Sequence, residues 1–400
     1  MAIDFALTPE QEAIRDLAHQ FAAEEMRPRA AEYDEREEVP WDVMRRAHAL
    51  GIGPASAIPA AYGGGALDPI SMLVLGEELA WGDAGIAVSI MASGLAATAI
   101  LATGTEAQKT RYLGALCDPG TLRLAAMGLT EPDSGSDALA LRTRAAAVDG
   151  GWVLDGTKQF CTNGGIADLQ VVFATTDRQL GAAGIEGFVV ERGNPGMRQG
   201  RRERKLGVRA SHTAQVILEG CRVAADARLG SDTDGATAGP GALGAMLMLE
   251  ASRPQVAVGA LGIARAAYEF ALDYAKGRQQ FGRPIARHQA IAFKLADMAT
   301  EIDAARLLTW RAGWMVQQGL PMARGEGSMA KLMAGDVAMR VTLEAVQVLG
   351  GYGYIKEYPV ERWMRDAKIY QIWEGTAEIQ RLVIGRLLAG ERSATRAPVV

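Results

Sequence analysis

Over the first 125 residues, hydrophobic positions recur at the spacing of amphipathic helices. The clearest start is Thr8-Pro9-Glu10-Gln11, which combines an N-cap, a proline in the first turn and a capping-box glutamine. Pro28 is expected to kink or end the helix that begins there. Further helices are expected over 40–50, 69–81, 86–103 and 106–117. This pattern predicts an N-terminal helical domain over residues 1–122.

The pattern changes near residue 122, where short β-type runs replace the helical spacing. These runs are 123–129, 144–148, 152–154, 170–175, 187–191 and 214–218. Asp149-Gly150-Gly151 is a hairpin signal between two of them. The sequence therefore predicts a middle β domain, a barrel or sandwich, over residues 123–235.

Helical spacing returns after a stretch rich in glycine, alanine and threonine at 231–241, which is a loop or linker by composition. The long helical patterns cover 242–276, 288–318, 324–349 and 377–389, and Pro254 is expected to bend the first of them. They predict a C-terminal helical domain over residues 236–400. The expected fold is thus a mainly helical α+β protein of three domains.

Composition and charge exclude some classes of function. The 400 residues are 49% apolar and 22% charged, as in soluble globular proteins, and the net charge of −5 disfavours wholesale nucleic-acid binding. Cys117, Cys161 and Cys221 form no CxxC pair, and the four histidines show no metal-ligand spacing. We therefore expect no metal site and a reducing compartment, and the visible N-terminus, which shows no signal segment, favours the cytoplasm.

The uncharged stretch 84–105 is long enough to test as a membrane span. It is rich in alanine, glycine, serine and threonine, and Gly94 interrupts it. We interpret it as a buried core helix rather than a membrane segment.

One carboxylate near the C-terminus has an unusual setting. Glu374 lies between Trp373 and Gly375, just before Thr376, which is the expected N-cap of the last helix. The helix N-terminus favours the carboxylate anion, whereas burial beside the indole raises the pKa. That balance suits a general base, although the motif on its own is more often an ordinary acidic side chain before a helix.

Several other segments concentrate groups that can bind a ligand. Residues 130–137 form a loop rich in hydroxyls, and 158–165 place Phe160 and Thr162 on one face of a strand, suited to stacking and hydrogen bonding with a planar ring. Residues 198–209 are the densest basic cluster, either a solvated loop or a phosphate contact. The pattern GxGxxG at 239–244 follows no strand and does not indicate a dinucleotide fold.

Taken in order, these segments resemble the acyl-CoA dehydrogenase family over nearly the whole chain, most closely its short- and medium-chain branch. The matching motifs are LTEPDSGSD (129–137), TKQFCTNGG (157–165), KLGVRAS (205–211), RQQFG with HQ (278–282 and 288–289), QVLGGYG (347–353) and RDAKIYQIWEGTAEIQR (365–381). The resemblance implies a middle β domain between an N-terminal helical domain and a C-terminal four-helix bundle. It also implies FAD, bound without a dinucleotide fold, and a homotetramer built as a dimer of dimers.

The resemblance also assigns roles to single residues. Glu374 matches the base that removes the α-proton of an acyl thioester while hydride leaves Cβ for flavin N5, and Glu250 is its only rival. The positions matching FAD contacts, some of them to a neighbouring subunit's FAD, are Leu129, Thr130, Phe160, Thr162, Arg278, Gln280, Phe281, His288, Gln289, Gln347, Gly350, Gly351, Thr376 and Glu378. The positions matching substrate contacts are Ser136, Glu250, Arg253, Trp373 and Gly375.

The implied activity is α,β-dehydrogenation of an acyl-CoA to a trans-2-enoyl-CoA, with electrons passing to an electron-transfer flavoprotein. No nucleic acid or membrane partner is expected. Because 84–105 carries no charge and Met91 matches the end of the acyl pocket, we expect an apolar acyl group. Two alternatives stay open: an oxidase that gives its electrons to oxygen on the same scaffold, and a flavin-free helical interaction protein.

Overall fold

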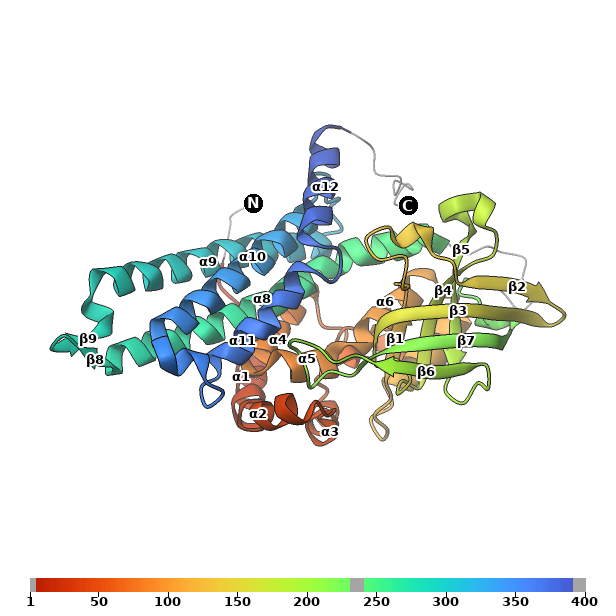
Figure 1. Ribbon diagram of the computed structural model, residues 1–400. Coiled ribbons are helices and arrows are strands. Elements are labelled where there is room, and N and C mark those ends of the chain that lie inside the picture. The colour runs from red at the N-terminus through yellow and green to blue at the C-terminus, as the bar shows by residue number, and fades with distance from the viewer. Residues whose placement is uncertain (1–4, 231–240, 391–400) are drawn as a thin grey trace.

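The computed structural model describes residues 5–230 and 241–390 (Figure 1). Its N-terminal part is helical, with α1 (Pro9–Phe21), α2 (Arg27–Arg36), α3 (Trp41–Ala49), α4 (Pro69–Gly82), α5 (Ala84–Met91), α6 (Ser93–Thr103) and α7 (Glu106–Leu116). The predicted capping box is present, because the Thr8 hydroxyl accepts a hydrogen bond from the Gln11 backbone and the Gln11 side chain accepts one from the Thr8 backbone.

Pro28 does not end the helix that contains it. A π-helical stretch, Ala22–Met26, joins α1 to α2, and Pro28 lies in the first turn of α2. A proline is tolerated at that position because its missing N–H lies among the backbone groups that the start of a helix leaves unpaired.

The uncharged stretch 84–105 forms α5 and α6 instead of one helix. Residues 84–103 are long and apolar enough to cross a membrane by length and composition alone, but 61% of their most apolar window is buried inside the protein. The stretch packs as core helices, in agreement with the interpretation drawn from its small residues.

The middle part is a curled sheet with the order β1-β4-β2-β3-β7-β6, in which β5 also pairs with β4. Its strands are β1 (Ala125–Gly128), β2 (Arg144–Val148), β3 (Gly151–Thr162), β4 (Leu169–Thr175), β5 (Ile185–Glu191), β6 (Met197–Arg202) and β7 (Thr213–Ala224). The hairpin expected at 149–151 joins β2 and β3. Strand β6 was not expected, because its exposed edge carries arginines and no hydrophobic alternation; part of the basic cluster is therefore a strand and not a loop.

The C-terminal part contains the long helices α8 (Gly241–Gly277), α9 (Gln289–Gln317) and α10 (Glu326–Leu349), followed by α11 (Val360–Ala367) and α12 (Ala377–Leu388). Helix α11 was missed, and residues 279–284, expected as a helix end, form the small hairpin of β8 (Gln279–Gln280) and β9 (Arg283–Pro284). Helix α8 continues through Pro254. The predicted linker over 231–241 lies, except for Gly241, outside the described residues.

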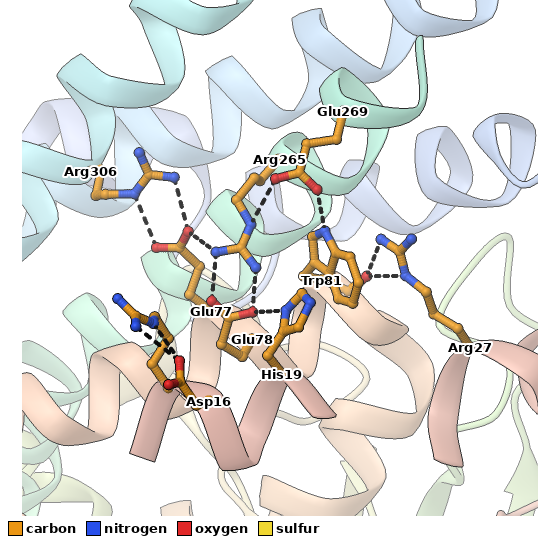
Figure 2. Close-up of polar contacts among 10 residues, drawn as sticks. Asp16, His19, Arg27, Glu77, Glu78, Trp81, Arg265, Glu269 and Arg306 are labelled. Carbon is orange, nitrogen blue, oxygen red and sulfur yellow. Dashed lines mark hydrogen bonds and ion pairs between the residues drawn. The ribbon is translucent and has the colours of Figure 1, made fainter. Parts of the chain in front are cut away.

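The two helical parts share one hydrophobic core, in which α4 packs against α8. A buried charge network spans the same junction (Figure 2). Arg265 of α8 donates to two carboxylates of α4, to Glu77 at 2.9 Å and to Glu78. Arg306 of α9 also donates to Glu77, at 2.9 Å. His19 of α1 lies 2.8 Å from Glu78. The network ties α1 and α4 of the N-terminal part to α8 and α9 of the C-terminal part.

Candidate active site

The turn that carries Glu374 joins a short 3₁₀ segment, Lys368–Gln371, to helix α12. Glu374 has a φ of 53° and Gly375 a φ of 90°, so two successive residues adopt left-handed backbone conformations. A left-handed backbone is uncommon for a residue other than glycine and marks local strain that the surroundings must maintain. Thr376 then caps α12 by accepting from the Ile379 N–H at 3.3 Å, as predicted.

Side chains from two helices hold this turn by its carbonyls. The amide of Gln380 in α12 donates to the carbonyls of Glu374 and Gly375, each at 3.0 Å. The ammonium of Lys331 in α10 donates to the same Gly375 carbonyl at 2.7 Å. Glycine is favoured at position 375 because its φ of 90° is a conformation that other residues rarely adopt, and a Cβ there would lie 2.6 Å from the Gln380 amide that holds the turn. The backbone of the turn that carries Glu374 is therefore clamped from two sides.

Asp336, five residues further along α10, fastens both sides of the same turn. Its carboxylate accepts from the Gln371 amide at 2.7 Å and from Arg381 at 2.9 Å. A Cβ at Gly335 would lie 2.7 Å from the Tyr370 carbonyl, so the chain leading to Glu374 rests directly on α10. Helix α10 thus supports the turn that carries Glu374 along one side.

The Glu374 carboxylate is in a setting that favours proton uptake. Burial raises its pKa, and the positive charges of Lys331 and then Arg253 act in the opposite direction. Its Oε2 atom is buried and has no hydrogen-bond partner among the described residues. The sequence predicted the effect of burial on this pKa, whereas the charges that oppose it are those of Lys331 and Arg253, whose effect was not predicted. An unsatisfied carboxylate oxygen in a partly apolar site is chemically able to act as a base.

Arg253 of α8 acts electrostatically on this carboxylate, and Glu250 lies three residues before Arg253 on the same helix. Their side chains approach to 4.0 Å, and Arg253 donates to the hydroxyl of Ser328 at 2.9 Å. Burial raises the pKa of Glu250, and Arg253 opposes that shift. The structure therefore brings the proposed base and its rival to the same guanidinium.

The middle domain presents a second group of predicted residues. Strand β3 has an irregular register between Lys158 and Cys161, and Phe160 there has a φ of 56° and is 62% exposed. Such a bulge turns a side chain out of the sheet. The N–H of Gln159 donates to the Thr130 carbonyl at 2.8 Å, which holds the 129–137 loop beside β3. Leu129 and Thr130 therefore lie beside the strand that carries Phe160 and Thr162, whereas Ser136 is exposed on the loop.

A buried ion pair supports that loop. Lys158, with no exposed surface, donates to the Glu131 carboxylate at 2.7 Å and to the Leu129 carbonyl at 3.0 Å. Glu131 also accepts from the backbone N–H groups of Arg142 at 2.6 Å and Thr143 at 2.9 Å.

We expect Lys158→Met to lower the free energy of unfolding by about 3 kcal/mol, because it leaves the buried Glu131 carboxylate without its counter-ion. Loss of the Leu129 contact should also weaken FAD retention, since the loop that carries Thr130 loses its support. Urea unfolding and flavin content after gel filtration measure the two effects. Unchanged values for both would contradict the assigned role; Lys356→Met, which removes an exposed lysine, is the matched control.

A third group lies at the far end of the long helices. A cavity of about 750 Å³ opens there beside the β8–β9 hairpin, and Phe281 is 93% exposed at its edge. The predicted residues that line it are Arg278, Gln280, Phe281, His288, Gly350 and Gly351. Gln289 and Gln347 are exposed on the adjacent ends of α9 and α10. The cavity offers an aromatic ring, a guanidinium and an open backbone at glycine, which suit a nucleotide cofactor.

This third group is distant from Glu374 within one chain. The end of α8 at Gly277 lies about 36 Å along the helix from Arg253, at a rise of about 1.5 Å per residue, and Figure 1 shows β8 and β9 at the opposite end of the helices from α12. One chain cannot place both groups around one reactive ring.

Sequence reasoning missed the residues that hold the base. Lys331, Asp336 and Gln380 were not singled out. A signal for Lys331 was present, because it is a charged residue among the buried alanines of α10, Ala330, Ala334 and Ala338. Burying a charged side chain costs free energy unless a polar partner compensates for it, so a polar partner was to be expected.

The comparisons with known proteins agree with this architecture. The chain matches the N-terminal, middle and C-terminal domain models of acyl-CoA dehydrogenase over residues 8–119, 126–221 and 239–389. It is 44% identical to a short-chain-specific acyl-CoA dehydrogenase of Megasphaera elsdenii, over 96% of this chain and all of that protein.

Solved structures give the same result. Butyryl-CoA dehydrogenase of Megasphaera elsdenii superposes with a TM-score of 0.91 at 42% identity, covering 97% of this chain and all of that one. A chain from the structure of the electron transferring flavoprotein of Acidaminococcus fermentans has a TM-score of 0.91 at 41% identity, covering 96% of this chain and 99% of that one.

The fold and the clamped glutamate define a three-domain flavoprotein oxidoreductase. The chain belongs to the acyl-CoA dehydrogenase family and is an FAD-dependent acyl-CoA dehydrogenase. The residues present fit that cofactor: the exposed ring of Phe160 and the cavity beside Phe281 offer aromatic surface, and Arg278 offers a charge for phosphate.

Proposed function

We propose that Glu374 is the base of the reaction and that the substrate is the CoA thioester of a short, uncharged acyl group. The observation that carries the assignment is the carboxylate itself: it lies on a left-handed turn whose backbone is clamped, its Oε2 is buried without a hydrogen-bond partner among the described residues, and two cations lie beside it. A base held in this way has its reorientation cost met before substrate binds.

In the proposed reaction, the Glu374 carboxylate removes the α-proton of the thioester. Loss of that proton places negative charge on the thioester oxygen, which a hydrogen-bond donor must stabilise. The backbone N–H of Glu374 donates to no backbone carbonyl among the described residues and is a suitable donor. FAD, when bound, supplies the redox chemistry by accepting hydride from Cβ. Arg253 keeps positive charge beside the carboxylate before the proton moves.

Two observations support a short, uncharged acyl group. The apolar helices α5 and α6 carry no charged side chain and include the half-buried Met91, the residue expected at the end of the acyl pocket. The similar proteins named above act on short-chain acyl-CoA and on butyryl-CoA.

The test is anaerobic reduction of the bound flavin by a panel of acyl-CoA thioesters. Butyryl-CoA should bleach the oxidised flavin faster than octanoyl-CoA, and glutaryl-CoA should be the poorest of the three because its distal carboxylate has no counter-ion in α5 or α6. Lack of bleaching by every thioester would refute the proposed function, and preference for glutaryl-CoA would refute the uncharged pocket.

Electron-transfer flavoprotein is the proposed electron acceptor, supported by the similarity to a chain of the Acidaminococcus fermentans structure. Reoxidation of the reduced flavin should therefore be much faster with this acceptor than with air, and the reverse order would indicate an oxidase. A homotetramer, arranged as a dimer of dimers, is the proposed assembly. In such an assembly, the cavity beside Phe281 of one copy would contribute to the cofactor site of another.

A further inference from the structure

Lys331 is a buried cation that the proposed reaction leaves without a role. It lies in α10 with only 1% of its surface exposed, although lysine is rarely buried without a purpose. Its ammonium points to the turn before α12 and donates to the Gly375 carbonyl at 2.7 Å. Burying an ammonium is costly, and this position could be filled by an apolar residue if it served packing alone.

We propose that Lys331 is a positioning residue for the base: its ammonium holds the left-handed turn through the Gly375 carbonyl, and its charge keeps the Glu374 carboxylate ionised until substrate binds. The inference rests on the proposed role of Glu374. It assigns to one side chain both the placement and the charge state of the reacting group.

The geometry supports the placement. Gly375 follows Glu374 directly, and a bond to its carbonyl fixes the Gly375–Thr376 peptide plane, one residue beyond the base. Gln380 donates to the same carbonyl from the opposite element, α12. Asp336, on the helix that carries Lys331, anchors Gln371 before the turn. The strained backbone at Glu374 is therefore held by α10 on one side and by α12 on the other.

The charged groups around Lys331 support its proposed effect on the ionisation of Glu374. They are Glu374 on the turn, Arg253 on α8, Asp336 on α10 and Glu378 on α12. Burial lowers the pKa of Lys331 to about 8, so the side chain is still mainly cationic at neutral pH. Among the groups that act on Glu374, Lys331 is the strongest influence favouring the anion, ahead of Arg253. Loss of this cation should leave a carboxylate that protonates more readily.

Three substitutions separate charge from hydrogen bonding. Lys331→Arg retains both, Lys331→Gln retains a donor without charge, and Lys331→Met removes both. The probe is butyryl-CoA, and the measurement is the rate of anaerobic flavin reduction against pH. In the Gln and Met variants the acid limb should move upward by about one unit, whereas the Arg variant should stay near the parent. At pH values above the acid limb, flavin reduction in Lys331→Met should be about tenfold slower, because the hydrogen bond to the Gly375 carbonyl is lost.

A second readout does not depend on activity. Hydrogen exchange of the peptide that covers 371–380 should be faster in Lys331→Met than in the parent and in Lys331→Arg. If butyryl-CoA does not reduce the parent flavin, the proposed function fails, and the exchange result still decides whether Lys331 holds the turn.

The inference is overturned if the acid limbs of the Gln and Met variants coincide with that of the parent, or if exchange over 371–380 is unchanged. If Lys331 served folding alone, its substitutions would lower stability without moving the acid limb of the pH–rate profile. Should the Met variant fail to retain FAD, the comparison of Lys331→Gln with Lys331→Arg gives the same decision. Lys356→Met, at an exposed lysine, is the matched control.

Discussion

Glu374→Gln should abolish most flavin reduction by acyl-CoA, with a loss of about 10³–10⁴-fold in the rate constant. The amide has nearly the same shape as the carboxylate but cannot accept the α-proton. The clamp formed by Gln380 and Lys331 contacts only backbone carbonyls of this turn, so the backbone should be unaffected. The variant should therefore retain FAD and still bind butyryl-CoA, as shown by the perturbation of the flavin spectrum without bleaching.

The pH dependence gives a second check on the same residue. Burial raises the pKa of Glu374, and only the carboxylate form can take a proton. The parent rate should therefore fall as the pH drops through that raised pKa, above the usual carboxyl range. The residual rate of Glu374→Gln should lack this limb.

Glu250→Gln separates the two carboxylates, because both lie beside Arg253. If Glu250 were the base, this variant would lose activity as severely as Glu374→Gln is expected to. Glu219→Gln, the same change at an exposed glutamate, should leave the rate within about twofold of the parent. Near-normal turnover by Glu374→Gln would overturn the assignment of the base.

The three-part fold could be predicted from local pattern because its elements are long or strictly alternating. Helices α4, α7, α9 and α10 appear within a few residues of their expected bounds. The errors occur where tertiary packing decides. The edge strand β6 lacks hydrophobic alternation since water covers its exposed side chains. Helix α11 is one of the short elements, and the β8–β9 hairpin has two residues per strand, too few for any periodicity.

The candidate site was predictable only in part, for a related reason. Glu374, Gly375 and Thr376 are adjacent in the sequence, so the chemistry of the turn is visible as a motif. Lys331 reaches the same turn from a residue 44 positions away. A contact of that kind depends on how α10 lies against α12, which helical periodicity does not encode. Likewise, no single-chain pattern shows that the cavity beside Phe281 lies far from the base.

The largest expected loss of stability follows from Arg265→Met. Arg265 bonds two buried carboxylates, Glu77 and Glu78, each only 4% exposed. Without the guanidinium, Glu77 keeps Arg306 and Glu78 keeps His19, but the pair of like charges loses its shared counter-ion. Removing one partner from such a network costs about 3–5 kcal/mol. The free energy of unfolding should fall by that amount at pH 7 in urea titrations at fixed protein concentration.

Arg36→Met gives the matched control, because Arg36 pairs with Glu32 on the exposed face of α2 and should contribute less than about 1 kcal/mol.

Measurements at acidic pH test whether the loss of stability in Arg265→Met comes from its charge. Burial alone would raise the pKa of Glu78, but the hydrogen bonds and charges of Arg265 and His19 bring it below its ordinary value. A depressed carboxyl pKa stabilises the folded state above the unfolded pKa, and this contribution disappears as the pH falls through the folded pKa. The difference between the parent and Arg265→Met should therefore shrink below about pH 5. A difference that stays constant to lower pH would mean that Arg265 acts through packing of its side chain and not through its charge.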